Sequence, residues 1–309
     1  MRELAARVRA EVAKVVVGQD DTVEQLLAAA VVGGHVLLEG PPGTAKTLLA
    51  NALARSFDVG FRRVQFTPDM LPSDLTGTTA LRGGELAFRP GPIFTNVLLA
   101  DEVNRTPPKT QSALLEAMQE RQVSVDGETH VLAAPFLVLA TQNPIEYEGT
   151  YPLPEAQLDR FLFKLDLGYL PEDDEIAVLR LAHRGVAAPS LDVVRPVASA
   201  DELEGARQEV DATAVSDEVA GFVVSLVRRT RELPAVELGA SARASVHLLA
   251  AAKALARLAG RDFATPDDVV DAARPVLRHR LVLRPEAELE RYTTADAIEA
   301  VLASVPVPR

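Results

Sequence analysis

The stretch "GPPGTAKT", from Gly40 to Thr47, comes within one residue of a common phosphate-binding loop. The loop pattern is G-x-x-x-x-G-K-[ST], and this chain has Ala45 where the pattern has its second glycine. "HVLLE" precedes the stretch as an expected strand, and "KTLLANALARSF" follows it as an expected helix. In that setting, small residues let backbone N–H groups wrap a phosphate while the helix points its positive N-terminus at it. The stretch therefore predicts a phosphate site, although a relaxed motif standing alone can also be a chance match in a glycine-proline turn.

The residues of this loop are candidates for nucleotide binding, and two of them have defined tasks. Lys46 would reach the β- and γ-phosphates, and Thr47 would place its hydroxyl on Mg²⁺. We expect Ala45 to have a negative φ at the start of the helix, because a residue with a Cβ resists positive φ. The full candidate set is Gly40, Pro41, Pro42, Gly43, Thr44, Ala45, Lys46, Thr47 and Leu48.

Polar residues also follow two later apolar strands. "NVLLADE" (96–102) ends in Asp101 and Glu102, and "FLVLATQ" (136–142) is followed by Asn143. Asp101 would bind Mg²⁺, largely through water, because this ion sheds its hydration shell reluctantly. Glu102 would orient or deprotonate the attacking water, a role worth about 10²–10⁴-fold in rate. Asn143 could hold the same water from the opposite side.

Each of these polar features also has an ordinary structural interpretation. Taken alone, an acidic pair after a strand is a solvated turn, and Asn143 before Pro144 is an Asx turn. Combined with the loop, they predict hydrolysis of a nucleotide. The chain has no N-K-x-D motif for reading guanine, so we expect the base to be adenine and the ligands to be ATP and Mg²⁺.

The first half of the chain alternates strand-like and helix-like segments, which is typical of a parallel sheet covered by helices. The short apolar runs suit strands buried on both faces. Two hairpins interrupt the alternation, one over residues 79–88 around Gly83-Gly84 and one over residues 121–132 around an Asp-Gly pair. The predicted fold class is therefore α/β, a parallel sheet between helices with two β-hairpin insertions. The five expected strands span residues 35–40, 62–66, 96–102, 136–142 and 161–167.

From about residue 186 the pattern changes to helices only. Three helical stretches begin at a capping residue, namely Ser216, Ser241 and Thr265. Residues 183–200 carry few helix signals and two prolines, which makes them the expected linker. We therefore expect a nucleotide-binding core over residues 1–185 and a smaller all-α lid domain over residues 186–309.

Composition limits the class of protein. The 309 residues are 48% hydrophobic, enough to bury a substantial core. The formal net charge of −12 argues against wholesale wrapping of nucleic acid or an anionic membrane. The longest apolar run, residues 26–32, is far shorter than the ~20 residues that span a bilayer, and the N-terminal stretch is an amphipathic helix and not an export signal. With no cysteine, which fits a reducing compartment, we expect a soluble cytoplasmic protein without membrane insertion.

Six motifs lie in order along the chain: "GPPGTAKT", "QFTPDMLPSDLTGT", "FRPGPIF", "LLADEVNRTPPKTQSALLEAMQE", "LATQNPIEYEGTYPLPEAQLDRF" and "RHRLVL". Together they resemble the MoxR-type AAA+ ATPases, densely from Val17 to Leu170 and more thinly to Leu283. The resemblance implies a ring-forming ATPase, usually a homo-oligomer of six, with the nucleotide at the junction between subunits. Family members are thought to act as chaperones that mature client proteins or insert cofactors into them. Their partners often carry a von Willebrand A domain.

The resemblance also assigns roles to individual residues. It implies an arginine finger at Arg160 in "LDRF", a side chain that would stabilise charge on the transferring phosphate by roughly 10³–10⁵-fold; a surface salt bridge is the ordinary alternative. It implies sensor 2 at Arg243, although this chain has Ala242 where the family commonly has proline. Whether Arg243 reaches the ATP of its own subunit or a neighbour's stays open, and Arg105 is either an interface residue or a local counter-ion. The remaining assignments are Walker A at Gly40, Gly43, Lys46 and Thr47, Walker B at Asp101 and Glu102, and sensor 1 at Asn143.

The leading hypothesis is a MoxR-type ATPase ring that remodels client proteins, and three alternatives stand beside it. One is the motor subunit of a metal chelatase, from a sibling clade that shares both hairpins. Another is a scaffold that binds ATP to assemble a ring and recruit a partner with little hydrolysis. The third, a nucleic-acid motor, is disfavoured by the net acidity and by an aromatic content of 5%. The sequence does not identify the client.

Overall fold

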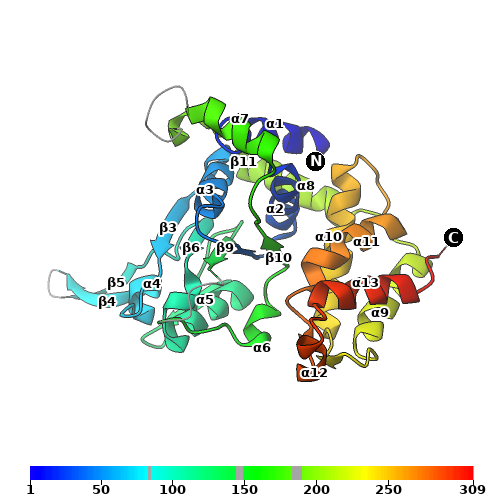
Figure 1. The fold of residues 1–309 in the computed structure, drawn as a ribbon. Helices are drawn as coiled ribbons and strands as arrows, with labels where there is room; N and C mark the ends of the chain where they lie inside the picture. The colour runs from blue at the N-terminus through cyan, green and yellow to red at the C-terminus, as the bar shows by residue number, and fades with distance from the viewer. Residues whose placement is uncertain (83–84, 144–148, 183–189, 309) are drawn as a thin grey trace.

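A five-stranded parallel sheet forms the centre of the first half of the chain (Figure 1). The structure, a computed structural model, describes residues 1–82, 85–143, 149–182 and 190–308. All five expected strands are present, and the predicted fold class is confirmed. In the order in which they pair, the strands are β10 (Phe163–Asp166), β1 (Val36–Glu39), β9 (Leu137–Gln142), β6 (Val97–Asp101) and β3 (Phe61–Gln65).

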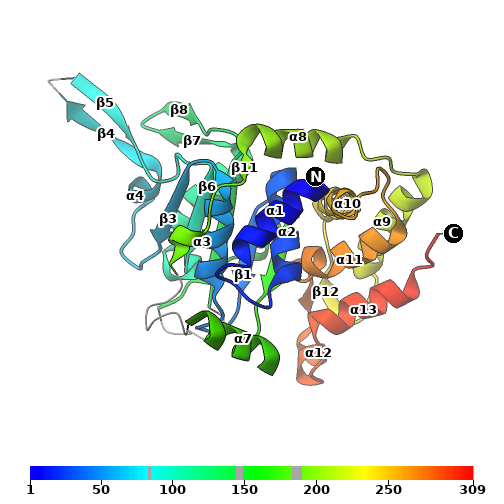
Figure 2. The same cartoon turned by 90° about the horizontal axis from the view of Figure 1, so that it is seen from above.

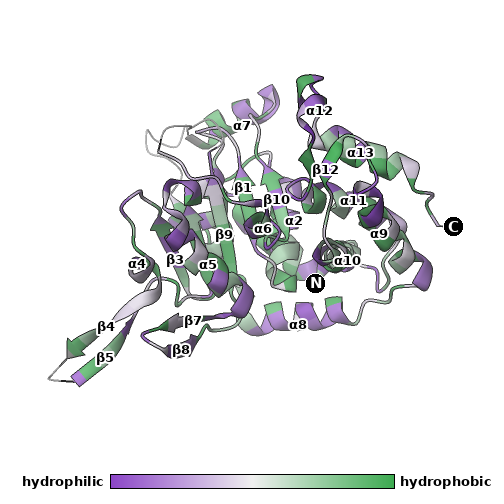
Figure 3. Ribbon diagram, turned by 90° about the horizontal axis from the view of Figure 1, so that it is seen from below, coloured by the Kyte–Doolittle hydropathy of each residue, from purple (hydrophilic) through white to green (hydrophobic). Residues whose placement is uncertain are grey.

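Side chains of the central strands alternate between two buried layers. In β6, Val97 and Leu99 belong to one apolar cluster, whereas Leu98 and Ala100 belong to the other. This alternation is the period of a β-strand buried on both faces. Figure 3 shows the hydrophobic residues concentrated on β1, β9 and α2. The first layer is covered by α1 (Arg2–Val12), α2 (Asp20–Val32) and α3 (Lys46–Ser56), and the second by α4 (Pro72–Thr76) and α5 (Pro108–Glu120).

Two antiparallel hairpins project from the same side of the molecule (Figure 2). In the first, β4 (Gly77–Arg82) pairs with β5 (Glu85–Pro90); in the second, β7 (Gln122–Val125) pairs with β8 (Glu128–Val131). Asp126 and Gly127 have φ values of 51° and 85°, as a two-residue turn of the expected type requires. The Gly83-Gly84 turn lies outside the described residues. Phe88 of β5 stacks on His130 of β8 with ring centroids 3.8 Å apart, so the two hairpins are in contact.

The second half of the described chain consists mainly of helices. Three of them, α9, α10 and α11, begin directly after the predicted capping residues. Ser216 accepts a backbone N–H at the start of α9, and Thr265 begins a capping box at the start of α11. Ser241 stands at the N-cap of α10 but donates its hydroxyl to Asp159 instead of capping the helix. Among the described helices, none is long and apolar enough to cross a membrane. The helices are α8 (Ala200–Asp211), α9 (Asp217–Thr230), α10 (Ala242–Leu258), α11 (Pro266–Leu277), α12 (Pro285–Leu289) and α13 (Thr294–Ser304).

Two short ladders accompany these helices and were not expected from a helices-only pattern. One joins β12 (Val236–Leu238) to β13 (Val282–Leu283), and the other joins β11 (Ala198–Ser199) back to β2 (Phe57–Asp58) in the first half. The second ladder therefore ties the region after the expected linker to the α/β core. The boundary predicted between residues 185 and 186 lies outside the described residues.

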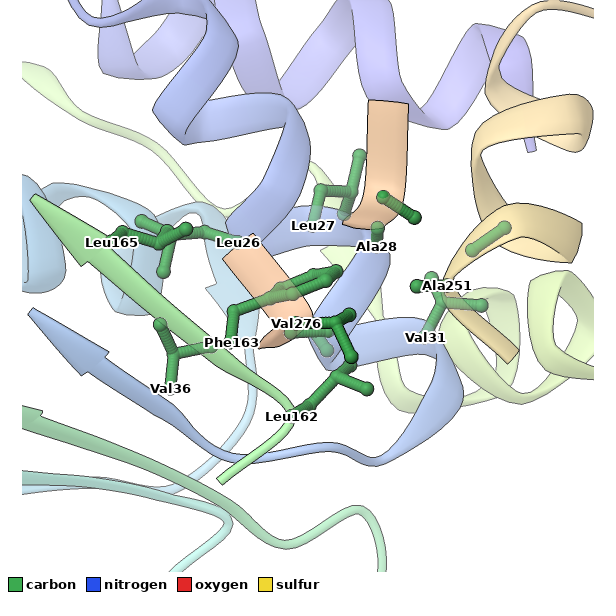
Figure 4. Close-up of a cluster of buried hydrophobic side chains, with 14 of the residues drawn as sticks. Leu26, Leu27, Ala28, Val31, Val36, Leu162, Phe163, Leu165, Ala251 and Val276 are labelled. Carbon is green, nitrogen blue, oxygen red and sulfur yellow. The ribbon is translucent and has the colours of Figure 1, made fainter. Parts of the chain in front are cut away.

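Helix α2 packs between the sheet and the lid helices (Figure 4). Phe163 of β10 is fully buried and shares one cluster with side chains from α2, α10 and α11. Because β10 is an edge strand, this packing places the lid against the edge of the sheet. The other members drawn and labelled are Leu26, Leu27, Ala28, Val31, Val36, Leu162, Leu165, Ala251 and Val276.

Candidate functional site

The loop between β1 and α3 is tightly folded around the side chain of Lys46. A Cβ at Gly40 would lie 2.2 Å from the carbonyl oxygen of Leu167, so only glycine fits there. Gly43 has a φ of 85°, which also favours glycine. Lys46 Nζ donates to the carbonyl oxygens of Gly40 and Pro41 at 2.7 and 2.8 Å. The ammonium group therefore lies inside the loop that would bind phosphate.

Ala45 differs from our expectation. Its φ is 61° and its ψ is 19°, in the left-handed region, and it stands at the N-cap of α3. The prediction of a negative φ was therefore wrong. The chain enters α3 through a left-handed residue, the conformation for which the loop pattern has glycine, and an L-residue adopts that conformation at a cost of about 1–2 kcal/mol. Strain of this kind persists only where the surrounding structure imposes it.

The side chains that follow Ala45 present a cation and an oxygen donor. Burial lowers the pKa of Lys46, while the carboxylates of Asp101, Glu102 and Glu39 oppose the shift. Thr47 Oγ1 lies 3.2 Å from Oδ1 of Asp101. A hydroxyl and a carboxylate are the hard oxygen ligands that Mg²⁺ prefers. Mg²⁺ usually keeps several waters and is bound through one or two carboxylates together with substrate phosphates, so the Asp101 carboxylate and the Thr47 hydroxyl fit this ion.

Asp101, at the end of β6, accepts hydrogen bonds from both flanking strands. Thr141 of β9 donates its hydroxyl to Oδ1 at 2.6 Å. Arg63 of β3 donates to Oδ2 through Nη2 at 2.7 Å and through Nε at 3.1 Å. The Asp101 side chain is only 6% exposed. Sequence reasoning missed both donors, because only the pairing order of the strands places them beside Asp101.

Glu102 lies next to Asp101 with its backbone in the left-handed region, at a φ of 57°. Gln65 Nε2 donates to Oε2 of Glu102 at 2.6 Å, and Arg105 Nε lies 3.1 Å from the same oxygen. The N–H of Glu102 donates to the hydroxyl of Thr141 at 2.9 Å. Arg105 is therefore a counter-ion of Glu102 within the chain, and its role at a subunit interface stays a prediction. Gln65 is a further residue that sequence reasoning missed.

These residues line one open cavity of about 480 Å³. It brings together the loop from Pro42 to Leu48, both carboxylates and Asn143 of the predicted site. Arg63, Gln65 and Thr141 line it as well. Gly40 and Pro41 do not line the cavity, but their carbonyl oxygens accept hydrogen bonds from Lys46, which does.

A second cavity, of about 440 Å³, shares Gly43, Thr44, Ala45 and Leu48 with the first. Its remaining wall is mostly aliphatic and comes from residues 15–17, residues 168–170 and helix α7 (Glu172–Ala182). No local sequence pattern predicts this cavity, because its wall is assembled from segments far apart in the chain.

The two predicted arginines lie outside both of these cavities. Arg160 follows the short helix α6 (Glu155–Leu158), and its Nε is buried without a hydrogen-bond partner among the described residues. Arg243 is in the first turn of α10, with Nη1 3.7 Å from Oδ2 of Asp159. Arg243 therefore lies beside the side chain of Asp159, the residue that precedes Arg160 in the chain, and neither arginine lines the phosphate cavity of its own chain.

Two family models match this chain. The model described as ATPase family associated with various cellular activities (AAA) matches residues 35–163, and the model of an AAA lid domain matches residues 228–301. The first range contains the loop, both carboxylates, Asn143 and Arg160. The second range contains Arg243.

Known proteins resemble the chain over nearly its whole length. The YeaC protein of Bacillus subtilis (strain 168) is 47% identical over 297 residues, which are 96% of this chain and 92% of that protein. Chaperone MoxR1 of Mycobacterium tuberculosis is 44% identical over 311 residues, which are 97% of this chain and 81% of that protein. Among solved structures, a candidate ATPase from Cytophaga hutchinsonii matches with a TM-score of 0.91 and 43% identity, over 100% of this chain and 96% of that one.

Proposed function

This chain belongs to the MoxR-type AAA+ ATPases, and from that membership we propose that it hydrolyses ATP with Mg²⁺ in a homo-oligomeric ring and thereby remodels client proteins. The observation that carries the proposal is the meeting of the loop lysine, the Thr47–Asp101 pair and Glu102 in the wall of one cavity. Phosphoryl transfer depends mainly on positioning and on stabilisation of charge. These side chains supply both.

Each of those side chains has its own task in the proposed reaction. Lys46 exchanges its carbonyl contacts for the β- and γ-phosphates, which carry more negative charge. Thr47 and Asp101 hold Mg²⁺, which neutralises phosphate charge when it is bound. Glu102 orients the attacking water and accepts its proton. Asn143, on the wall formed by the end of β9, holds the same water.

The aliphatic cavity is our candidate for the adenine site. It begins at loop residues that also line the phosphate cavity, so a nucleotide with its phosphates in one can place its base in the other. Flat, weakly polar bases bind in pockets lined by hydrophobic side chains. The residues proposed for this contact are Val17, Tyr169 and Leu179.

We propose that Arg160 and Arg243 act on the ATP of a neighbouring subunit in a ring of six. A guanidinium can stabilise a transferring phosphate only if it reaches it, and neither arginine lines the phosphate cavity of its own chain. In this arrangement residues 1–185 form the nucleotide-binding core and residues 186–309 form the lid that presents Arg243.

The proposed client is a protein, and the proposed location is the cytoplasm. The relative from M. tuberculosis is named a chaperone, which supports maturation of clients or insertion of cofactors, with a von Willebrand A domain protein as partner. Apolar side chains on the projecting hairpins support a protein contact: Leu81 is 73%, Leu86 76% and Val131 75% exposed. Exposed apolar groups of this size mark interaction surfaces when they cluster.

The enzyme proposal is tested by ATP hydrolysis with and without Mg²⁺. Glu102→Gln should bind ATP but hydrolyse it about 10²-fold more slowly, so that ATP stays with the protein through gel filtration. Glu120→Gln, an exposed glutamate on α5, is the matched control and should hydrolyse at the wild-type rate. If wild-type protein releases no phosphate with Mg²⁺, or if Glu102→Gln matches it, the proposal fails.

An ATP-gated scaffold with little hydrolysis is a second candidate, favoured by one observation. Oε2 of Glu102 is already engaged by Gln65 and Arg105, which leaves this oxygen less available to the attacking water. Ring assembly and partner binding that persist in Arg160→Ala without hydrolysis would favour the scaffold over the motor.

A further inference from the structure

Arg280 is a buried cation that the proposed reaction does not use. It follows α11 in the stretch "RHRLVL", and its side chain is 1% exposed. Its Nε donates to Oδ1 of Asp159 at 2.8 Å, and its Nη2 donates to Nδ1 of His247 at 2.6 Å. Burial lowers the pKa of Arg280 to about 10, a shift that Asp159 opposes. The guanidinium is therefore charged at neutral pH.

The two terminal nitrogens of Arg280 also contact the backbone on both sides of Arg160. Nη2 donates to the carbonyl oxygens of Asp159 at 3.1 Å and Phe161 at 2.6 Å. Nη1 donates to that of Leu162 at 3.3 Å. One guanidinium from the lid therefore fixes the stretch of backbone from which Arg160 projects.

Asp159 connects this stretch to the second arginine. Its Oδ2 accepts a hydrogen bond from Ser241 Oγ at 3.0 Å, and Nη1 of Arg243 lies 3.7 Å from the same oxygen. Ser241 occupies the N-cap of α10 and makes no capping hydrogen bond there. The start of α10, which carries Arg243, is thus tied to the carboxylate next to Arg160.

We propose that Asp159 and Arg280 are positioning residues that hold Arg160 and Arg243 in one fixed arrangement, so that both cations reach the phosphates of a neighbouring subunit together. A buried ion pair adds little stability relative to apolar packing of the same volume, so stability alone does not account for it. A misplacement of about 1 Å in such a group can cost ~10²-fold in rate. The inference rests on the proposed function, because it requires a neighbour's phosphate site.

Asp159→Asn and Arg280→Lys test the positioning role while changing side-chain volume little. We expect kcat to fall by at least ~10-fold in both, with KM for ATP within about 3-fold of wild type, because neither residue lines a nucleotide cavity. Unchanged kcat in both variants would overturn the proposal. Thermal unfolding reports whether each variant is folded.

Arg278→Gln is the matched control. Arg278 also ties the lid to the sheet, through Nη1 at 2.5 Å from Oδ2 of Asp166. No hydrogen bond in the described part of the chain joins it to residues 159–162. It should keep kcat within about 2-fold of wild type.

Mixing two variants in one ring distinguishes misplaced arginines from a loss of function of the whole subunit. Asp159→Asn subunits keep an intact phosphate loop, and Lys46→Ala subunits keep both arginines in place. A mixture of the two should therefore hydrolyse ATP faster than the sum of the separate proteins. A mixture of Arg160→Ala with Lys46→Ala is the reference. If ATP hydrolysis recovers in the reference mixture but not in the mixture with Asp159→Asn, the positioning role is overturned. If it does not recover in the reference mixture, or if the wild type is inactive, the proposed ring reaction is overturned instead.

Amide hydrogen exchange tests the same arrangement without ATP hydrolysis. Exchange at residues 157–162 should accelerate in Asp159→Asn and stay unchanged in Arg278→Gln. Equal exchange in Asp159→Asn and wild type would overturn the proposal whatever the catalytic result.

Discussion

Arg63 and Asp101 form an ion pair at the edge of the sheet where the strands end. Nη2 and Nε of Arg63 lie 2.7 and 3.1 Å from Oδ2 of Asp101. The other carboxylate oxygen, Oδ1, faces the hydroxyls of Thr47 and Thr141. Since Asp101 is the proposed Mg²⁺ ligand, the guanidinium competes with a divalent cation for one of its oxygens.

Arg63→Ala should therefore lower the Mg²⁺ concentration at which ATP binding is half-maximal, by about 3–10-fold, because the carboxylate loses a cationic neighbour. A Mg²⁺ titration with a fluorescent ATP analogue measures the change. Arg62→Ala, which removes the same charge from the next position of β3, should leave the requirement unchanged. A requirement that rises in Arg63→Ala would mean that Arg63 binds the nucleotide's phosphates.

Gln65→Leu should raise the basal rate of ATP hydrolysis by about 2–10-fold. Gln65 donates a 2.6 Å hydrogen bond to Oε2 of Glu102, so removing the amide frees this oxygen to accept a proton from the attacking water. Steady-state hydrolysis at saturating ATP is the measurement, with Gln119→Leu on the exposed face of α5 as the control. A slower Gln65→Leu protein would show that this contact holds Glu102 in its working position.

Ala45→Gly should stabilise the folded protein by about 0.5–1 kcal/mol. Glycine adopts the left-handed conformation of this position without the cost that Ala45 incurs, and part of the gain is offset by the freer unfolded chain. The same substitution at Ala6, an exposed residue inside α1, should destabilise by about 1 kcal/mol. Urea unfolding measures the change in stability of both variants, and a loss of stability in Ala45→Gly would show that the backbone of Ala45 is not strained.

The site residues that could be predicted from the sequence are those at the carboxyl ends of strands. The loop follows β1, Asp101 ends β6 and Asn143 follows β9. Parallel strands bring their carboxyl ends to one edge of a sheet, so residues that follow such strands are expected on that edge, and β1, β9 and β6 are neighbours there. Arg63 and Gln65 lie within β3 and resemble exposed residues of an edge strand. They join the site only because β3 pairs with β6, which no local pattern states.

Two other features lay beyond sequence reasoning for different reasons. Residue type suggested a negative φ for Ala45, but the path of the loop into α3 overrides the preference of a single residue. Asp159 and Arg280 are 121 residues apart, and their contact depends on how the lid packs against β10. Packing of that kind has no periodicity in the sequence.

Burial lowers the pKa of three histidines, His35, His247 and His279, and His35 is the best defined of them. Its Nδ1 accepts the N–H of Val138 at 3.0 Å, so the proton is on Nε2, which donates to the carbonyl of Met118 at 3.0 Å. Burial, assisted by nearby Arg121, lowers the pKa of His35 to about 3. Burial also lowers the pKa of His247 to about 4 and that of His279 well below its usual value.

Below pH ~6.5 an unfolded chain protonates these histidines while the folded chain does not, so the free energy of unfolding falls as the pH falls. Each contributes about 1.4 kcal/mol per pH unit between pH ~6.5 and its folded pKa, and its full stability is present above pH ~6.5. His35→Gln does not titrate, so it should reduce the slope by about 1.4 kcal/mol per unit between pH ~6 and ~5 in urea unfolding. Val138→Ala should lower stability at every pH and leave the slope unchanged. Equal slopes in His35→Gln and wild type would contradict the assignment of a neutral, buried His35.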